Sequence, residues 1–124
     1  NLFEAEAAMP QQVLAVVKKS LVNSPESGII SIVVFGSMAR GLERLGSDLD
    51  LLVVLPTKHS IKALEPRMEK LRTLLFRRYS VPLSPYLQTV SELRQKYRRK
   101  LPLLVEILKD GQTVYGKELK ELLA

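Results

Sequence analysis

The sequence predicts an α/β domain (α+β in some schemes) in which about four strands form a sheet backed by helices. Two apolar, β-rich runs, Ile29–Phe35 and Asp50–Leu55, have the length and composition of buried strands. Apolar side chains recur at helical spacing in residues 13–21 and again in residues 64–75. Strands and helices thus alternate along the chain, which is typical of this fold class.

The composition is that of an ordinary globular protein, with 46% hydrophobic and 26% charged residues. A chain of 124 residues predicts one domain, residues 1–124. It contains no cysteine, which excludes disulfides and thiolate metal sites, and we expect a cytoplasmic protein. No apolar run approaches the ~20 residues of a membrane span. Because the sequence begins with Asn1 rather than Met, we expect a piece of a longer protein.

The first 27 residues predict a helix that runs to about residue 23, followed by a turn. Val13, Val17 and Leu21 fall on one apolar face, and Pro10 suits the first turn of a helix. The turn has the sequence Asn-Ser-Pro-Glu-Ser-Gly at residues 23–28. The simplest expectation is a helix that packs on the sheet.

The strand Ile29–Phe35 ends abruptly in Gly36-Ser37, as a buried strand entering a tight turn does. Ala39 and Arg40 suit the first turn of a short helix. Glycine lets a backbone approach a ligand closely, and the free N–H groups of a helix start attract anions such as phosphate. We therefore predict a phosphate cradle here, followed by a loop over residues 42–47.

Two carboxylates follow this turn. Asp48 and Asp50 are two residues apart, at the start of the second strand, so both side chains should lie on one face. Two like charges held together cost free energy unless a cation shares them, and oxygen ligands of this kind suit Mg²⁺ shared with nucleotide phosphates. Ser47 is expected to cap or orient the loop before Asp48. A turn that binds phosphate, followed by two carboxylates that bind a metal ion, predicts phosphoryl or nucleotidyl transfer.

The chain beyond Pro56 predicts three further helices, two strands and a last helix. Thr57–Ser60 should be a loop with a solvated His59, and the helix after it should hold Pro66 in its first turn. Prolines at 82 and 85 indicate that the strand Val81–Val90 either lies at an edge of the sheet or contains a bulge. The remaining expected elements are a helix from Ser91 with Leu93, Tyr97 and Leu101 on one face, a helix from Pro102 with Leu104, Val105 and Leu108 turned inward, the strand Gln112–Gly116, and a helix at Lys117–Ala124.

The net charge of +6 is concentrated between Lys58 and Lys100. This basic block is either a set of solvated helix faces or a surface that binds a polyanion, weakly and without sequence preference.

The string Phe-Gly-Ser-x-Ala-Arg-Gly at residues 35–41, with Ser-Asp-x-Asp-Leu at residues 47–51, resembles the signature of the nucleotidyltransferase superfamily. It is similar to the minimal nucleotidyltransferases, whose relatives include kanamycin nucleotidyltransferase and antitoxins that adenylylate a toxin. The resemblance implies a mixed sheet, and transfer of a nucleoside monophosphate from an NTP, ATP above all, to a hydroxyl of a protein or small molecule. It implies that Gly36, Ser37, Arg40 and Ser47 bind the nucleotide and that Asp48 and Asp50 bind Mg²⁺.

Active members of that superfamily place a third carboxylate on the next strand, and here the matching position is Ser84. The sequence holds no Asp or Glu between Glu69 and Glu92. Serine is a poor Mg²⁺ ligand and no general base at neutral pH, so catalysis should be slow or absent unless Glu92 substitutes.

Two functions stay open. One is a Mg²⁺-dependent nucleotidyltransferase. The other is a nucleotide-binding or protein-interaction module without catalysis, either an antitoxin with a toxin-like partner or the regulatory part of a DNA-binding protein. Some members of the superfamily carry a winged-helix DNA-binding domain upstream, and residues 1–27 would then be its linker.

Overall fold

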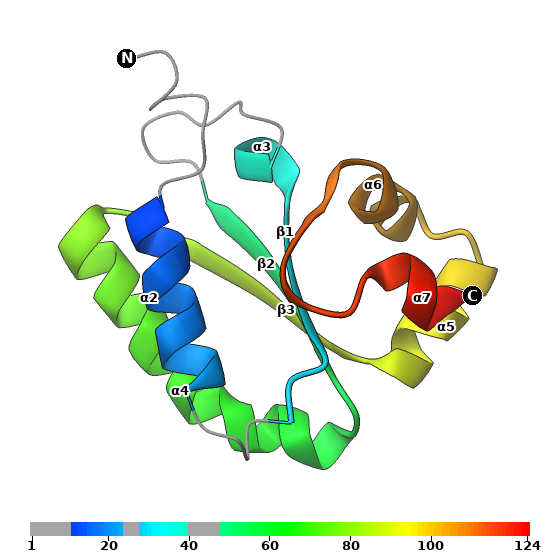
Figure 1. Cartoon of the computed structure of the whole chain (residues 1–124), viewed down its shortest axis with the longest axis horizontal. Helices are drawn as coiled ribbons and strands as arrows, with labels where there is room; N and C mark the ends of the chain where they lie inside the picture. Colours follow the sequence, from blue (N-terminus) through cyan, green and yellow to red (C-terminus); the bar gives the residue numbers. More distant parts are fainter. Residues whose placement is uncertain (1–10, 24–27, 40–47) are drawn as a thin grey trace.

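The structure is a computed structural model, and it describes residues 11–23, 28–39 and 48–124. In that part of the chain, helices and strands alternate as expected (Figure 1). The elements are α2 (Gln11–Val22), β1 (Ser31–Phe35), α3 (Gly36–Ala39), β2 (Leu49–Leu55), α4 (Lys58–Tyr79), β3 (Leu83–Thr89), α5 (Val90–Arg98), α6 (Pro102–Asp110), β4 (Gln112–Gly116) and α7 (Leu119–Leu123).

The strands form one mixed sheet in the order β3-β2-β1-β4. β1 pairs antiparallel with both β2 and β4, whereas β2 and β3 are parallel. A parallel pair needs a crossover connection, and α4 provides it. β1 and β2 are the central strands, which explains why their sequences are almost continuous apolar runs. The predicted α/β class with a mixed four-stranded sheet is confirmed.

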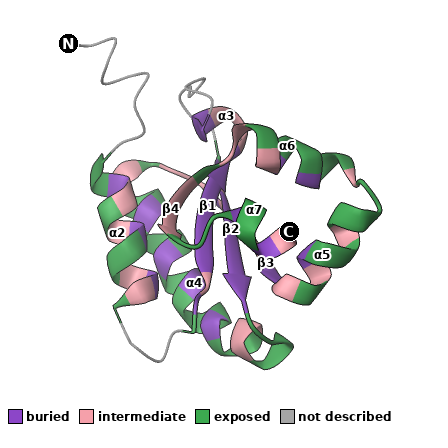
Figure 2. Cartoon of the chain, turned by 45° about the vertical axis from the view of Figure 1, so that its right-hand side comes forward, coloured by how far each residue is buried: buried purple, intermediate pink, exposed green. Residues whose placement is uncertain are grey.

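Helices cover both faces of the sheet, and side chains alternate between the two cores. α2 and α4 lie on one face, and α5, α6 and α7 on the other (Figures 1 and 2). Leu51 and Val53 of β2 belong to the first core, with the apolar side chains of α2 and α4. Leu52 and Val54 belong to the second, with those of α5, α6 and α7. This alternation decides the face on which every polar residue of β2 and β3 lies.

The long helix α4 differs from the sequence-based expectation at two places. Residues 58–60 are helical rather than a loop, because Thr57 and Ser60 form a reciprocal cap: the Ser60 N–H donates to Thr57 Oγ1 and the Thr57 N–H donates to Ser60 Oγ, each at 3.0 Å. Pro66 therefore lies inside the helix, not in its first turn. His59 is exposed, as expected.

β3 is an edge strand, one of the two alternatives that Pro82 and Pro85 indicated; Pro85 lies within the strand and Pro82 immediately before it. The strand is shorter than predicted, because Val90 already begins α5. The boundary is set by Thr89, whose hydroxyl accepts from the Glu92 N–H at 3.1 Å and so caps the helix.

Two apolar side chains near the C-terminal end are exposed: Tyr97, expected on one face with Leu93 and Leu101, and Val105, expected to point inward. Tyr97 is 43% exposed, because α5 ends at Arg98 and Leu101 is already the N-cap of α6. Val105 is 51% exposed, and Ile107 takes its place in the core beside Leu104. In a short helix, several sets of apolar residues can form the buried face. The packing of α6 on the sheet selects one of them.

Some expectations concern residues outside the described ranges: the helix before residue 11, most of the turn at residues 23–28 and the loop at residues 42–47. Among the helices that are described, none is both long enough and apolar enough to cross a membrane.

Candidate functional site

The Gly36 turn lies directly against Asp50. Phe35, the last residue of β1, is the register partner of Asp50 on β2. Gly36 follows with φ +75°, a backbone conformation that side chains rarely tolerate. A Cβ at this position would overlap Asp50 Oδ2 and lie 3.1 Å from its Cγ. Glycine is therefore required both by the turn and by the close approach of the carboxylate.

The short helix α3 spans Gly36–Ala39, so Ala39 lies in a short helix as expected, and the helix begins at Gly36 itself. Met38 and Ala39 are buried, whereas Ser37 is partly exposed. The Gln112 side chain, at the start of β4, donates to the Ala39 carbonyl at 2.7 Å. This bond ties the end of α3 to the start of β4, the strand that pairs with β1. Nothing in the sequence around Gln112 signals it, since the partners are more than seventy residues apart.

Asp50 lies on the face covered by α5, α6 and α7, because Leu52 and Val54 of the same strand belong to that core. It is partly exposed, while the other residues of β2 are buried. Asp48, which immediately precedes the strand, is exposed. The Leu49 N–H donates to the Pro82 carbonyl at 2.8 Å, so the β pairing extends to the residue between the two aspartates.

Ser84 is the register partner of Asp50 on β3. Neighbouring strands lie about 4.8 Å apart, and partners in register lie on the same face. Tyr86, two residues further along β3, packs with the core of that face. Ser84 therefore stands beside Asp50 on the face where Asp50 lies.

Glu92 lies at the opposite end of β3 and is engaged there. The residues from Ser84 to Thr89 span roughly 16 Å of strand, and Glu92 follows in the first turn of α5. Its carboxylate accepts from Lys58 Nζ at 2.7 Å and from the Thr89 N–H at 3.0 Å. The hydrogen bond from Lys58, and next the one from the Thr89 backbone, lower the pKa of Glu92. Its position and its bonds make it a helix cap, not a substitute third acid.

Glu92 predicts a pH-dependent stability. Because its pKa in the folded protein is lowered from 4.5, the ionised form stabilises the fold above about pH 4.5, and this contribution is lost as the pH falls through the folded-state pKa. We expect Glu92→Gln to lower the free energy of unfolding by about 0.5–1 kcal/mol at pH 7, since Lys58 is largely exposed, and to change it little at pH 3. Urea denaturation at both pH values measures the difference. Glu65→Gln, on the exposed side of α4, is the control, and an equal loss at pH 3 would contradict the assignment.

The donor set suits one Mg²⁺ ion bound together with phosphate oxygens. Asp48 and Asp50 offer the oxygen ligands that this ion prefers, and phosphates supply most of the others in nucleotide sites. Within residues 11–23, 28–39 and 48–124, no three Asp, Glu or His side chains cluster so as to hold an ion by themselves. The pair therefore fits a metal that arrives with a nucleotide, and it fits a second metal poorly. Arg40 and Ser47, the other predicted nucleotide contacts, lie outside the described residues.

The family model described as "Nucleotidyltransferase domain" matches residues 17–115 of the chain. This range contains the Gly36 turn, both aspartates and the whole sheet except Gly116. Comparison with curated protein sequences gives no match.

Solved structures resemble the fold at low sequence identity. Spectinomycin adenyltransferase AAD(9) from Enterococcus faecialis, solved with ATP and spectinomycin, has a TM-score of 0.65 and 18% identity, over 91% of this chain and 59% of that one. A toxin-antitoxin solved with AMP-PNP has a TM-score of 0.56 and 16% identity, over 89% of this chain and 80% of that one. The toxin-antitoxin MntA-HepT has a TM-score of 0.55 and 16% identity, over 91% of this chain and 80% of that one.

Proposed function

Because the chain belongs to the nucleotidyltransferase domain family, we propose that it binds an NTP with Mg²⁺ and transfers a nucleoside monophosphate to a hydroxyl acceptor. The observation that supports this most is the contact between Gly36 and Asp50. A glycine with positive φ presses its backbone against a carboxylate of the Asp-x-Asp pair, so the two halves of the sequence motif meet at one place. ATP is the preferred candidate, since AAD(9) was solved with ATP and a toxin-antitoxin with AMP-PNP.

In this proposal each residue of the site has one role. The Gly36 backbone and the Ser37 hydroxyl hold the triphosphate, and Arg40 adds a positive charge beside it. Asp48 and Asp50 would hold Mg²⁺, and Ser47 orients the chain before them. When bound, Mg²⁺ neutralises charge on the phosphates and helps to align the attacking oxygen.

Ser84 limits the reaction in the same proposal. An acceptor hydroxyl must lose its proton as it attacks, and a neutral serine hydroxyl is no base at neutral pH. Asp48 and Asp50 would both be engaged with Mg²⁺ and could not serve as the base. We therefore propose that turnover by this chain alone is slow, although nucleotide binding persists.

Calorimetry with Asp50→Asn tests the binding. Titrating MgATP, MgGTP and MgCTP into about 100 μM protein should give measurable heats for at least one nucleotide, even at millimolar affinity. We expect Asp50→Asn to weaken binding of the metal complex about tenfold or more, because a charged ligand is lost. Binding of ATP in EDTA should be unchanged or tighter, since a negative charge beside the triphosphate is removed.

The matched control is Glu65→Gln, which removes one negative charge from the exposed side of α4, on the face of the sheet opposite to Asp50. It should leave both affinities unchanged. Negligible heats with all three nucleotides would overturn the proposed nucleotide binding. An equal loss with and without the metal would overturn the assigned role of Asp50.

Ser84 also favours a second candidate function, a module that binds a nucleotide or a protein partner without catalysis. The solved toxin-antitoxin structures suggest an antitoxin with a toxin-like partner, and a DNA-binding protein with this domain as its regulatory part is the other form. Retained MgATP binding without pyrophosphate release, in the presence of hydroxyl acceptors, would favour this candidate over the enzyme.

A further inference from the structure

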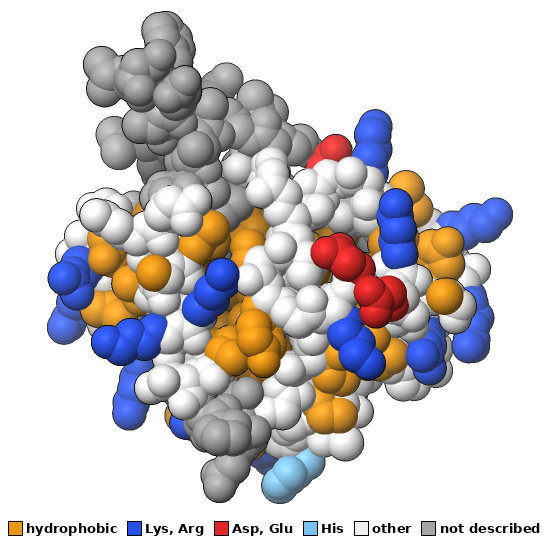
Figure 3. All heavy atoms as spheres, viewed as in Figure 1, with side chains coloured by type: hydrophobic (Ala, Val, Ile, Leu, Met, Phe, Trp, Pro, Cys, Tyr) orange, Lys and Arg blue, Asp and Glu red, His pale blue; other side chains and the backbone are white. Residues whose placement is uncertain are grey.

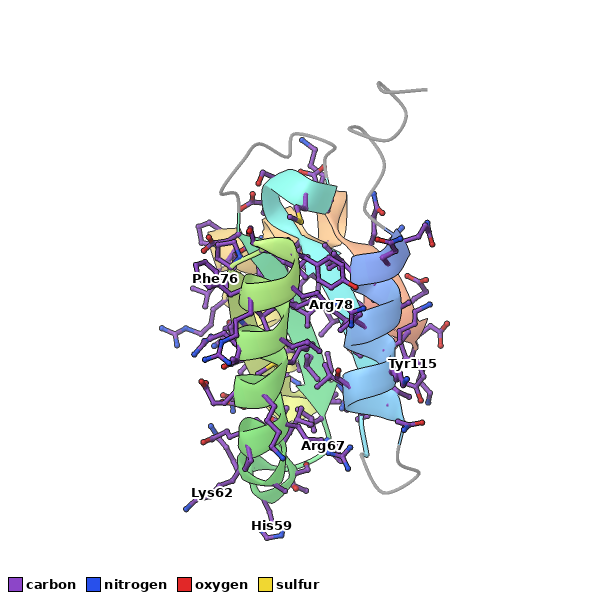
Figure 4. All side chains as sticks on the ribbon, turned by 90° about the vertical axis from the view of Figure 1, so that its left-hand side faces the viewer. His59, Lys62, Arg67, Phe76, Arg78 and Tyr115 are labelled. Atoms are coloured by element: carbon purple, nitrogen blue, oxygen red, sulfur yellow. The ribbon has the colours of Figure 1, made fainter. Side chains whose placement is uncertain are left out.

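An exposed aromatic ring stands near the end of α4, beside the edge of the sheet. Phe76 is 59% exposed, and Leu74 nearby is 38% exposed. Figure 4 shows Phe76 on the side of α4 away from α2. A pocket of about 340 Å³ lies next to the ring, lined by Arg72, Thr73, Phe76, Arg77, Pro82 and Leu83.

A second hollow, of about 450 Å³, adjoins this pocket through Thr73 and Arg77, and it adds Glu69, Lys70 and Leu74. We call the side chains that line the two hollows the Phe76 surface: Glu69, Lys70, Arg72, Thr73, Leu74, Phe76, Arg77, Pro82 and Leu83. It lies on the α4 side of the sheet, where Leu83 is part of the core, whereas Asp50 lies on the opposite face.

The Phe76 surface is positively charged. Residues 67–78 contain five Lys or Arg and one acidic residue, Glu69. Glu69 is already paired with Arg72 at 2.8 Å, so the acid offsets only one of the cations. Lys70 and Arg77 make no ion pair with any other described residue. Figure 3 shows basic side chains along the left edge of the molecule, over α2 and α4, whereas the Phe76 side of α4 faces away from the viewer there.

Arg78 and Arg67 do not belong to this surface. Figure 4 shows both on the side of α4 that faces α2, and the Arg78 guanidinium lies 5.8 Å from the centre of the Tyr79 ring. Of the cations at the Phe76 surface, Arg72 is paired with Glu69, whereas Lys70 and Arg77 make no ion pair with a described residue and are available to an anionic ligand.

A flat ring surrounded by cations matches the chemistry of single-stranded nucleic acid. Cations attract the phosphates, and an exposed aromatic ring stacks on an unpaired base whatever its identity. An acidic protein helix would instead need a continuous apolar groove for anchors three or four residues apart. Here Arg72, Thr73 and Arg77 interrupt the apolar side chains, so the observations favour the nucleic acid.

We propose that the Phe76 surface binds single-stranded nucleic acid without sequence preference, with a base stacked on Phe76 and phosphates held by Lys70, Arg72 and Arg77. The proposal concerns binding alone and does not rest on nucleotide transfer at Asp50. The Phe76 surface contains part of the basic block at residues 58–100, with an exposed aromatic ring among its cations.

Fluorescence anisotropy with labelled twelve-nucleotide oligo-dT and oligo-U tests the proposal. We expect dissociation constants between about 10⁻⁶ and 10⁻⁴ M, rising about 7- to 20-fold from 50 to 200 mM salt if two or three phosphates are contacted. Phe76→Ala should weaken binding of both oligonucleotides about 5- to 100-fold, because one stacked base is lost. Phe76→Trp should restore it. Arg77→Gln should flatten the logarithmic salt dependence by about 0.7.

Matched controls distinguish binding at the Phe76 surface from attraction by the overall positive charge of the protein. Val105→Ala removes another exposed apolar side chain, 51% exposed on α6, and should leave the affinity unchanged. Binding of a DNA duplex should not respond to Phe76→Ala, because paired bases do not offer their faces to the ring. The melting temperature of each variant verifies that the fold is intact. We expect it to be unchanged, because the substituted side chains are exposed.

Three outcomes would overturn the proposal. One is an affinity of Phe76→Ala for oligo-dT equal to that of the parent protein. Another is the absence of binding at 50 mM salt. The third is binding of an acidic amphipathic peptide at Phe76 by a protein that does not bind either oligonucleotide.

Discussion

Replacing Ser84 with Asp is expected to raise the rate of pyrophosphate release by about 10²–10⁴-fold, the usual contribution of one general base. Ser84 is the register partner of Asp50, so a carboxylate introduced there would stand about 4.8 Å away along the sheet and on the same face. It would add the negative charge that a second Mg²⁺ requires and a group to accept the proton of the acceptor. The measurement is pyrophosphate release from ATP with a candidate hydroxyl acceptor, beside the parent protein.

Two variants control for the substitution itself. Ser84→Ala should not raise the rate, because it adds no acid. Ser91→Asp makes the same chemical change on the exposed first turn of α5, at the far end of β3, and should also have no effect on the rate. A parent protein that already turns over at an ordinary ~1–10² s⁻¹, with no gain from Ser84→Asp, would show that another group serves as the base.

Gly36→Ala is expected to damage the fold and the nucleotide site together. The positive φ of Gly36 costs an alanine roughly 1–2 kcal/mol, and the overlap of the new Cβ with Asp50 Oδ2 adds the cost of displacing a packed group, about 1–3 kcal/mol. We therefore expect the free energy of unfolding to fall by about 2–5 kcal/mol. Binding of MgATP should weaken at least as much as in Asp50→Asn, since the carboxylate must move.

Gly28→Ala is the matched control for this prediction. Gly28 also has a positive φ, +66°, but a Cβ there would meet no atom within 4 Å. It should lower stability only by the backbone cost of about 1–2 kcal/mol and leave MgATP binding unchanged. Urea denaturation and calorimetry on both variants give the comparison. Equal losses of stability would mean that the contact between Gly36 and Asp50 contributes nothing.

Much of the fold could be predicted because it follows from local sequence. The apolar runs at β1 and β2 have no helical period, and their continuity reflects burial on both faces of the sheet. Pro82 and Pro85 indicated an edge position or a bulge, since proline cannot donate to a neighbouring strand, and β3 is an edge strand. The alternation of strands and helices then left few possible architectures.

The expectations that proved wrong share a cause: a short stretch of sequence is compatible with more than one helix start or buried face. Pro66 suits a first turn, yet the reciprocal cap between Thr57 and Ser60 starts the helix earlier and leaves the proline inside it. Val105 fits an inward apolar stripe as well as Ile107 does, and only the docking of α6 on the sheet distinguishes them. Local propensity is weak at such places, and tertiary packing overrides it.

For the candidate site, the sequence by itself determined the chemistry: a glycine-serine turn, two aspartates two residues apart, and a serine instead of an acid on the third strand. Only the tertiary structure decided which of these groups meet. The register of β1, β2 and β3 brings Gly36 against Asp50 and Ser84 beside it, while it leaves Glu92 at the far end of β3 as the cap of α5. The reason is physical, because side-chain chemistry belongs to each residue, whereas strand register depends on burying two apolar cores at once.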